Sequence, residues 1–150
     1  MARTRARKSK APTRPSKTSS PTNASTVVLV VEDEPTVRTL AASTLAEHGY
    51  ATLSAANGTE ALALLSNDDT PIDLLFTDIN MPDGPDGLEL ALQAVELRPA
   101  LRVVYTSGGG QTDGMIARFV DGATFLPKPY TNEQLVETVG MADRRAKTSQ

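Results

Sequence analysis

The sequence contains no cysteine, which excludes disulfides and thiolate metal sites. Long apolar runs are also missing. The longest ones, 26–31 and 72–76, are far shorter than the about 20 residues that cross a bilayer. No apolar core follows the basic N-terminus, so a signal peptide is not indicated. A length of 150 residues fits one ordinary domain and not two. These features predict a single-domain cytoplasmic protein with no membrane partner.

Acidic residues are absent from residues 1–26, which hold seven of the 15 Lys and Arg side chains. The other eight basic residues face all 18 Asp and Glu, so residues 27–150 carry a formal charge of −10. A segment with so few apolar residues cannot offset the entropy of ordering, and we predict that 1–26 is a disordered basic tail. We interpret it first as a solubilising extension, with nucleic-acid binding as the alternative. A transit peptide fits the composition, but no amphipathic apolar stripe supports one.

Apolar, β-branched runs alternate with helical patterns from Thr26 onward. Pro35 suits a helix start, Asn57 suits a helix cap, and Thr131 with Gln134 forms a capping box. The predicted strands are 26–31, 50–55, 72–77, 102–106 and 124–126. The predicted helices follow Pro35 and Asn57, cover 88–97 and, weakly, 112–120, and run from Thr131 towards Arg145. Five strand–helix repeats predict an α/β fold, with helices on both faces of a parallel sheet.

Polar side chains that could form a site follow four of the five predicted strands. The second strand, 50–55, has no such residue at its end and is therefore expected at an edge of the sheet. These residues are Glu32, Asp33, Asp78, Ser107 (with Thr106 as the alternative hydroxyl) and Lys128. Open parallel sheets place their sites outside the carboxyl ends of the strands. Clustered carboxylates repel each other unless a cation joins them. Oxygen ligands without His or Cys favour a hard ion such as Mg²⁺. A metal-bound aspartate beside a lysine and a hydroxyl is suited to attack phosphorus.

Each of these residues has an ordinary explanation when it is taken alone. Acids at 32–34 favour the start of a helix because of its dipole, and Asp78 suits a helix cap. Ser107 suits a turn, and Lys128 suits an exposed loop. The four positions together favour a site, because all of them fall where open α/β sheets place one.

Four segments of the sequence resemble the signature segments of bacterial two-component receiver domains, in the same order. They read Val-Val-Glu-Asp-Glu-Pro, Phe-Thr-Asp-Ile-Asn-Met-Pro-Asp-Gly, Val-Tyr-Thr-Ser-Gly and Leu-Pro-Lys-Pro-Tyr. The resemblance implies a flavodoxin-like (βα)₅ fold with a five-stranded parallel sheet in the order 2-1-3-4-5. It divides the chain into the tail 1–26, a receiver domain over 27–146 and a short C-terminal tail over 147–150.

The resemblance also implies a role for each residue of the set. Asp78 would be the phospho-acceptor, and Lys128, before a cis peptide bond to Pro129, would pair with the phosphoryl group. Mg²⁺ would be bound by Asp33, by Asp78, by the backbone carbonyl of Asn80 and, through water, by Glu32. Ser107, or alternatively Thr106, would be the hydroxyl switch and Phe125 the aromatic switch. The sequence departs from the family in having Glu32 where Asp is commoner, and in a loop after Asp78 that is one residue longer.

We therefore expect a signalling protein that takes a phosphoryl group from a histidine kinase or a histidine phosphotransfer protein. It would be no enzyme beyond its own phosphorylation and dephosphorylation, and without an output domain it would act as a phosphate sink or bind an unknown partner. That partner would bind the face formed by the helix 112–120, the strand 124–126 and the final helix. The rival class is the aspartyl-phosphate phosphatases, which carry a second Asp where this chain has Asn80. A pseudo-receiver is disfavoured because no acceptor-site residue is missing.

Overall fold

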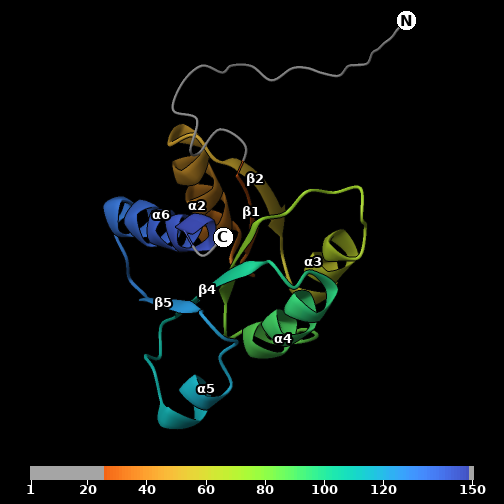
Figure 1. Cartoon of the computed structure of the whole chain (residues 1–150). Helices are drawn as coiled ribbons and strands as arrows, with labels where there is room; N and C mark the ends of the chain where they lie inside the picture. Colours follow the sequence, from red (N-terminus) through yellow and green to blue (C-terminus); the bar gives the residue numbers. More distant parts are fainter. Residues whose placement is uncertain (1–25, 149–150) are drawn as a thin grey trace, which may run out of the picture.

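The computed structural model describes residues 26–148. The predicted tail 1–26 therefore lies outside the described residues except for Thr26, and so do the last two positions of the predicted tail 147–150. Five parallel strands form one sheet in the order β2-β1-β3-β4-β5 (Figure 1). They are β1 (Val27–Val31), β2 (Ala51–Ala55), β3 (Leu74–Asp78), β4 (Arg102–Ser107) and β5 (Thr124–Pro127). This order confirms the predicted fold, including the edge position of the second strand.

Two layers of helices cover the sheet (Figure 1). The helices are α2 (Pro35–Glu47), α3 (Gly58–Leu65), α4 (Gly87–Leu97), α5 (Asp113–Ala117) and α6 (Asn132–Thr148). One apolar core packs α2 and α6 against the sheet, around side chains such as Phe76 and Leu135. The other core joins α3 and α4 to the opposite face, around side chains such as Leu75 and Leu90. Among the described residues, no helix is long and apolar enough to cross a membrane.

Side-chain caps fix where several helices begin. The Asn57 side chain accepts a hydrogen bond from the Glu60 backbone N–H at 2.9 Å, at the start of α3. At α6, the Thr131 hydroxyl accepts from the Gln134 N–H at 3.0 Å, while the Gln134 side chain accepts from the Thr131 N–H at 2.9 Å. These bonds satisfy backbone donors that a helix start otherwise leaves free. The predicted cap and capping box are both present.

The largest difference from the sequence prediction is α5, which has five residues instead of the predicted span 112–120. Its first turn follows three glycines, and it contains Gly114, a residue that weakens helices. Beyond Ala117 tighter turns replace the helical pattern, because the N–H groups of Arg118 and Phe119 donate to the carbonyls of Met115 and Ile116. The next N–H, that of Val120, donates to the Tyr105 hydroxyl at 3.1 Å. The last helix is longer than predicted and ends at Thr148 rather than near Arg145.

Candidate functional site

The carboxyl ends of the strands bring the predicted site residues to one edge of the sheet. Asp78 is the last residue of β3 and pairs in register with Thr106 of β4, while Ser107 pairs with Pro127 of β5. Parallel pairing makes these ends coincide, because all five strands run in the same direction. Glu32 directly follows β1 and donates its backbone N–H to the carbonyl of Ala55 in β2.

Lys128 lies between two buried carboxylates. Its Nζ is 3.0 Å from Asp78 Oδ2 and 3.0 Å from Glu32 Oε1. The side chains of Glu32 and Asp78 are 4% and 7% exposed, whereas that of Lys128 is 25% exposed. One ammonium therefore faces two carboxylates in a partly desolvated place, where charge interactions are stronger than in water. If all three groups are ionised, this triad is left with one net negative charge.

A third carboxylate adds to this negative charge. Glu32, Asp33 and Asp78 each place one oxygen within 4.8 Å of the others. Lys128 is their one ion-pair partner among the described residues. Oxygen donors in this arrangement fit a hard divalent cation. Asp33 is exposed, so water has access to this side of the cluster and can complete the coordination shell. The structure thus brings together the three acidic residues that the sequence analysis selected.

The ionisation of Glu32 reflects the crowding of negative charge. Burial raises the pKa of Glu32 from its ordinary 4.5 to about 7, and the charge of Asp78 adds to the rise, while Lys128 opposes it. Burial alone would lower the pKa of Lys128, but its hydrogen bonds to Glu32 and Asp78 outweigh burial and raise it. A divalent cation at this cluster would favour the carboxylate form of Glu32.

Asp78 is held from a second direction by Asn80. The Asn80 backbone N–H donates to Asp78 Oδ1 at 3.1 Å, and its side-chain Nδ2 donates to Ser107 Oγ at 3.0 Å. The hydroxyl of Thr106 is buried with no hydrogen-bond partner among the described residues. Of the two candidate hydroxyls, Ser107 is the one bonded to the Asp78 segment. The sequence analysis gave a role only to the backbone carbonyl of Asn80 and missed its side chain.

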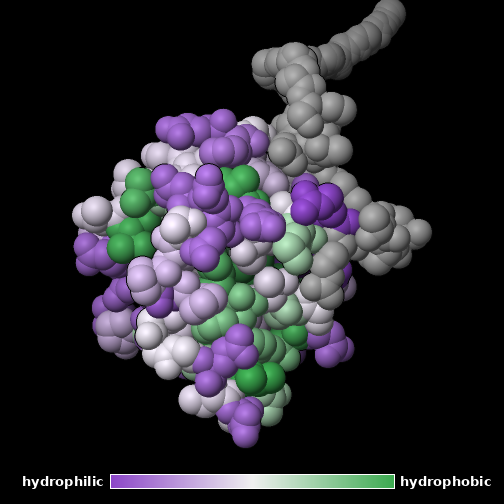
Figure 2. Space-filling model, turned by 90° about the vertical axis from the view of Figure 1, so that its left-hand side faces the viewer, coloured by the Kyte–Doolittle hydropathy of each residue, from purple (hydrophilic) through white to green (hydrophobic). Residues whose placement is uncertain are grey.

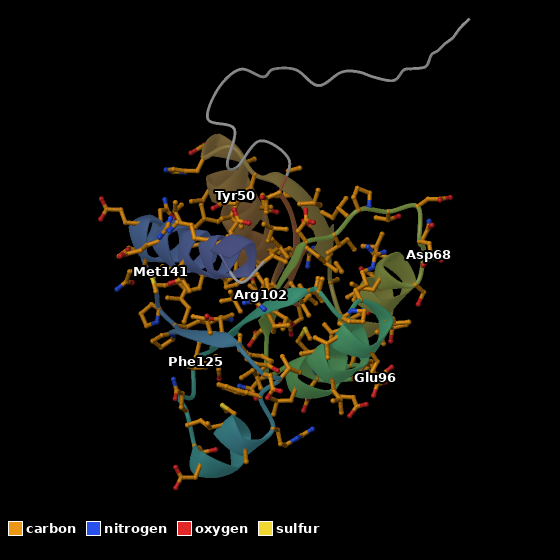
Figure 3. The ribbon with its side chains drawn as sticks, in the orientation of Figure 1. Tyr50, Asp68, Glu96, Arg102, Phe125 and Met141 are labelled. Atoms are coloured by element: carbon orange, nitrogen blue, oxygen red, sulfur yellow. The ribbon has the colours of Figure 1, made fainter. Side chains whose placement is uncertain are left out.

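The predicted aromatic switch belongs to a row of three rings. Phe125, labelled on β5 in Figure 3, is half-buried and stacks on Phe119 with ring centroids 6.1 Å apart. Phe119 stacks in turn on the fully buried Tyr105, at 4.4 Å. Sequence reasoning missed Tyr105 and Phe119. The available signal was a tyrosine directly after two valines in a predicted strand, because a buried phenol needs a hydrogen-bond partner.

The loop that carries Lys128 contributes a further group that the sequence analysis did not select. The Lys128–Pro129 peptide bond is cis, as predicted. Tyr130 follows it, and its ring forms a T-shaped pair with that of Phe76 at a centroid distance of 5.9 Å. Burial, and then the charge of Glu32, raise the pKa of Tyr130 to about 12. Tyr130 therefore remains a neutral wall of the site.

The sequence is similar to those of known proteins of one family. Residues 28–140 match the family model of the response regulator receiver domain. Over 117 residues, or 77% of the chain, the sequence is 35% identical to the DNA-binding transcriptional regulator NtrC of Salmonella typhimurium. Over the same share it is 38% identical to the response regulator protein PilR of Pseudomonas aeruginosa and 33% identical to the sensor kinase CckA of Brucella abortus. The chain spans 24%, 26% and 12% of the lengths of these relatives.

Solved structures show the same fold. A response regulator receiver protein from Sinorhizobium medicae superposes with a TM-score of 0.75 at 28% identity, over 81% of this chain and 97% of that chain. The receiver domain of the hybrid histidine kinase CckA superposes with a TM-score of 0.66 at 38% identity, over 77% of this chain and 97% of that chain.

The raised pKa of Glu32 predicts a pH-dependent stability. Between about pH 4.5 and 7 the folded, metal-free protein holds a proton on Glu32 that the unfolded chain has lost. The free energy of unfolding should therefore fall as the pH rises through this window. Glu32→Gln should flatten this slope. Urea unfolding in EDTA at several pH values measures it, and an equal slope in the variant would contradict the assignment to Glu32.

Magnesium should stabilise the protein, and more at pH 8 than at pH 6, because the ion competes with the proton on Glu32. At 100 times the dissociation constant, the gain is about 2.7 kcal/mol by mass action. Asp33→Asn, a change at an exposed position, should remove this gain while preserving the pH slope of the metal-free protein. Thermal melts with and without Mg²⁺ test both points. If millimolar Mg²⁺ does not change the melting temperature of the wild type, the predicted magnesium site is excluded.

Proposed function

Because the chain belongs to the response regulator receiver domain family, we propose that it accepts a phosphoryl group on Asp78 from a histidine kinase or a histidine phosphotransfer protein. One observation carries the proposal: Asp78 shares Lys128 with Glu32, at 3.0 Å from each, beside the carboxylate of Asp33. This is an arrangement in which a carboxylate nucleophile, a cation site and an ammonium face one reacting group.

The residues of the site divide the chemistry between them. An oxygen of Asp78 attacks the phosphorus of the phosphohistidine, the P–N bond breaks, and its electron pair stays on the imidazole. Lys128 supplies positive charge where negative charge gathers on the phosphoryl oxygens. Mg²⁺, when held by Asp33, Asp78 and the backbone carbonyl of Asn80, with Glu32 acting through water, would neutralise part of that charge. Glu32 and Asp78 are buried, so water reaches the cluster from the side of the exposed Asp33.

Signalling is favoured over hydrolysis of a separate substrate. A phosphatase that uses an Asp nucleophile needs a second carboxylic acid two positions later as general acid, and this chain has Asn80 there. An amide has no proton to give to a leaving group at neutral pH. We therefore assign the protein a phosphoryl-accepting role in the cytoplasm, in which the readout is a change in partner binding.

The partner that reads the phosphorylated state is proposed to bind the face of α5, β5 and α6. The triple-glycine loop after Ser107 leads into α5, and Phe125 lies on β5. The side of the molecule that carries α6 and β5 has hydrophobic patches among hydrophilic side chains (Figure 2). Two large apolar side chains on these elements are 44% exposed, namely Ile116 on α5 and Met141 on α6. A shift of Ser107 towards the phosphoryl group would change the packing beside them.

The phosphodonor is proposed to dock on α2, next to Lys128. An apolar pocket of about 270 Å³ lies between α2 and the segment that follows β5, with Leu40 and Tyr130 in its wall and Lys128 at its border. Leu40 is 57% exposed. A helix that covers this apolar surface would carry a reactive histidine close to Asp78, since the pocket and Asp78 share Lys128.

Acetyl phosphate with Mg²⁺ should add one phosphoryl group to the intact protein, measured by mass spectrometry. Asp78→Asn should abolish the gain, because the amide is not a nucleophile of this kind. Asp69→Asn, a change to an exposed aspartate between α3 and β3, is the matched control and should be labelled like the wild type. Undiminished labelling of the Asp78 variant would overturn the assignment.

Leu40→Asp should slow transfer from a phosphorylated histidine donor by about tenfold or more, because a charge in an apolar contact costs more than about 1.4 kcal/mol. Labelling by acetyl phosphate should not change, since this small donor needs no docking surface. Leu92→Asp, at a similarly exposed leucine of α4, is the control. Equal slowing by both variants, or slower acetyl phosphate labelling, would contradict docking on α2.

A further inference from the structure

The side chain of Asn80 connects the acceptor residue to the glycine loop. Its backbone N–H donates to Asp78 Oδ1 at 3.1 Å, and its Nδ2 donates to Ser107 Oγ at 3.0 Å. Ser107 Oγ accepts a second bond, at 3.2 Å, from the backbone N–H of Gly109. A continuous chain of hydrogen bonds thus runs from the Asp78 carboxylate through Asn80 and Ser107 into the loop that precedes α5.

The Ser107 hydroxyl has a limited number of donor and acceptor sites, and most of them are occupied in this series of hydrogen bonds. A hydroxyl has two acceptor sites and one donor hydrogen, and Asn80 and Gly109 fill the two acceptor sites. No group of residues 26–144 accepts a bond from the Ser107 hydroxyl. Its hydrogen is therefore available to a phosphoryl oxygen, but moving Oγ itself towards a phosphoryl group on Asp78 would lengthen the bond that it accepts from Asn80.

We propose that Asn80 is a positioning residue whose side-chain amide holds the Ser107 hydroxyl in the unphosphorylated arrangement and so sets how readily the protein switches. This proposal rests on the phosphoryl-accepting function of Asp78. The Asn80 amide competes with the phosphoryl group for the position of one hydroxyl. A contact that is present in one of two states and lost in the other shifts their equilibrium by its own free energy.

The surroundings of this bond suit a movable contact rather than a structural one. Asn80 is exposed, so truncating its side chain leaves no cavity in the core. A Cβ built on Gly108 or Gly110 would have no neighbour within 4 Å among the described residues. Gly110 has a φ of +78°, a conformation that glycine adopts without strain. The loop therefore has room to follow Ser107 when the hydroxyl turns.

Removing the amide should make switching easier. One net hydrogen bond shifts an equilibrium by roughly two- to tenfold. Asn80→Ala should therefore bind beryllofluoride, a phosphoryl mimic, with Mg²⁺ roughly two- to tenfold more tightly than the wild type. The increase should vanish in the Ser107→Ala background, because the amide then has no hydroxyl to hold. A double-mutant cycle of Asn80→Ala and Ser107→Ala, measured by beryllofluoride titration, isolates this coupling.

A second measurement tests the proposal without any phosphoryl mimic. The Gly109 N–H donates to Ser107 Oγ, so freeing the hydroxyl should speed amide exchange at Gly109 about two- to tenfold in Asn80→Ala. Asn67→Ala is the matched control, because it also removes an asparagine side chain with one hydrogen bond, accepted from the Asp69 N–H at 3.0 Å, but at a position beyond α3, away from the site. It should leave exchange at Gly109 unchanged.

The two measurements separate failure of this proposal from failure of the proposed function. If the wild type binds no beryllofluoride, the phosphoryl-accepting function is wrong, while the exchange at Gly109 still tests the hold of Asn80 on Ser107. Equal effects of Asn80→Ala in the wild-type and Ser107→Ala backgrounds would overturn the proposal, because Asn80 would then act on the metal or phosphoryl group directly. Weaker binding of beryllofluoride by Asn80→Ala than by the wild type would also overturn the proposal. So would a rate of amide exchange at Gly109 in Asn80→Ala equal to that of the wild type.

Discussion

The sharing of Lys128 between Glu32 and Asp78 is the interaction on which the rest of the site depends. Two buried carboxylates next to each other would repel strongly without a cation, and Lys128 supplies only one positive charge for both. The remaining negative charge raises the pKa of Glu32, which burial already raises, to about 7 and makes the site an attractive place for a divalent ion. The same residual charge means that Lys128 does not fully neutralise Asp78, which suits the nucleophilic role proposed for it.

The fold supplies this interaction through the parallel sheet. Glu32, Asp78 and Lys128 come from the ends of three strands that lie far apart in the sequence, and parallel pairing brings those ends together. Lys128 reaches both carboxylates from a loop held by its own backbone N–H, which donates to the Ser107 carbonyl at 3.0 Å. Lys128 therefore connects the end of β4, through its backbone N–H, with the carboxylate of Asp78, through its ammonium group.

Most of the sheet was predictable, because buried parallel strands are apolar runs bounded by turns. The polar residues at the ends of these runs are easy to identify in the sequence. Glu32, Asp33, Asp78 and Lys128 were selected in this way, and the structure brings them together. The short length of α5 was not predicted, because the chain after Ala117 forms turns and then a tertiary contact, from the Val120 N–H to the Tyr105 hydroxyl, that the local sequence pattern does not show. The bond from Asn80 to Ser107 joins residues 27 positions apart, and no local pattern announces it. The order of the strands along the chain indicates which strand ends lie together. It does not indicate which side chains at those ends form hydrogen bonds with each other.

Asp78 is proposed to accept a phosphoryl group in a cluster that Lys128 already organises. A crystal structure of the protein with Mg²⁺ and beryllofluoride tests it most directly. We expect the beryllium bonded to a carboxylate oxygen of Asp78, one fluoride within hydrogen-bond distance of Lys128 Nζ and another reached by the Ser107 hydroxyl, which has left the Asn80 side chain. Beryllofluoride absent from Asp78, or bound there while Lys128 stays between Glu32 and Asp78 without touching a fluoride, would contradict the account.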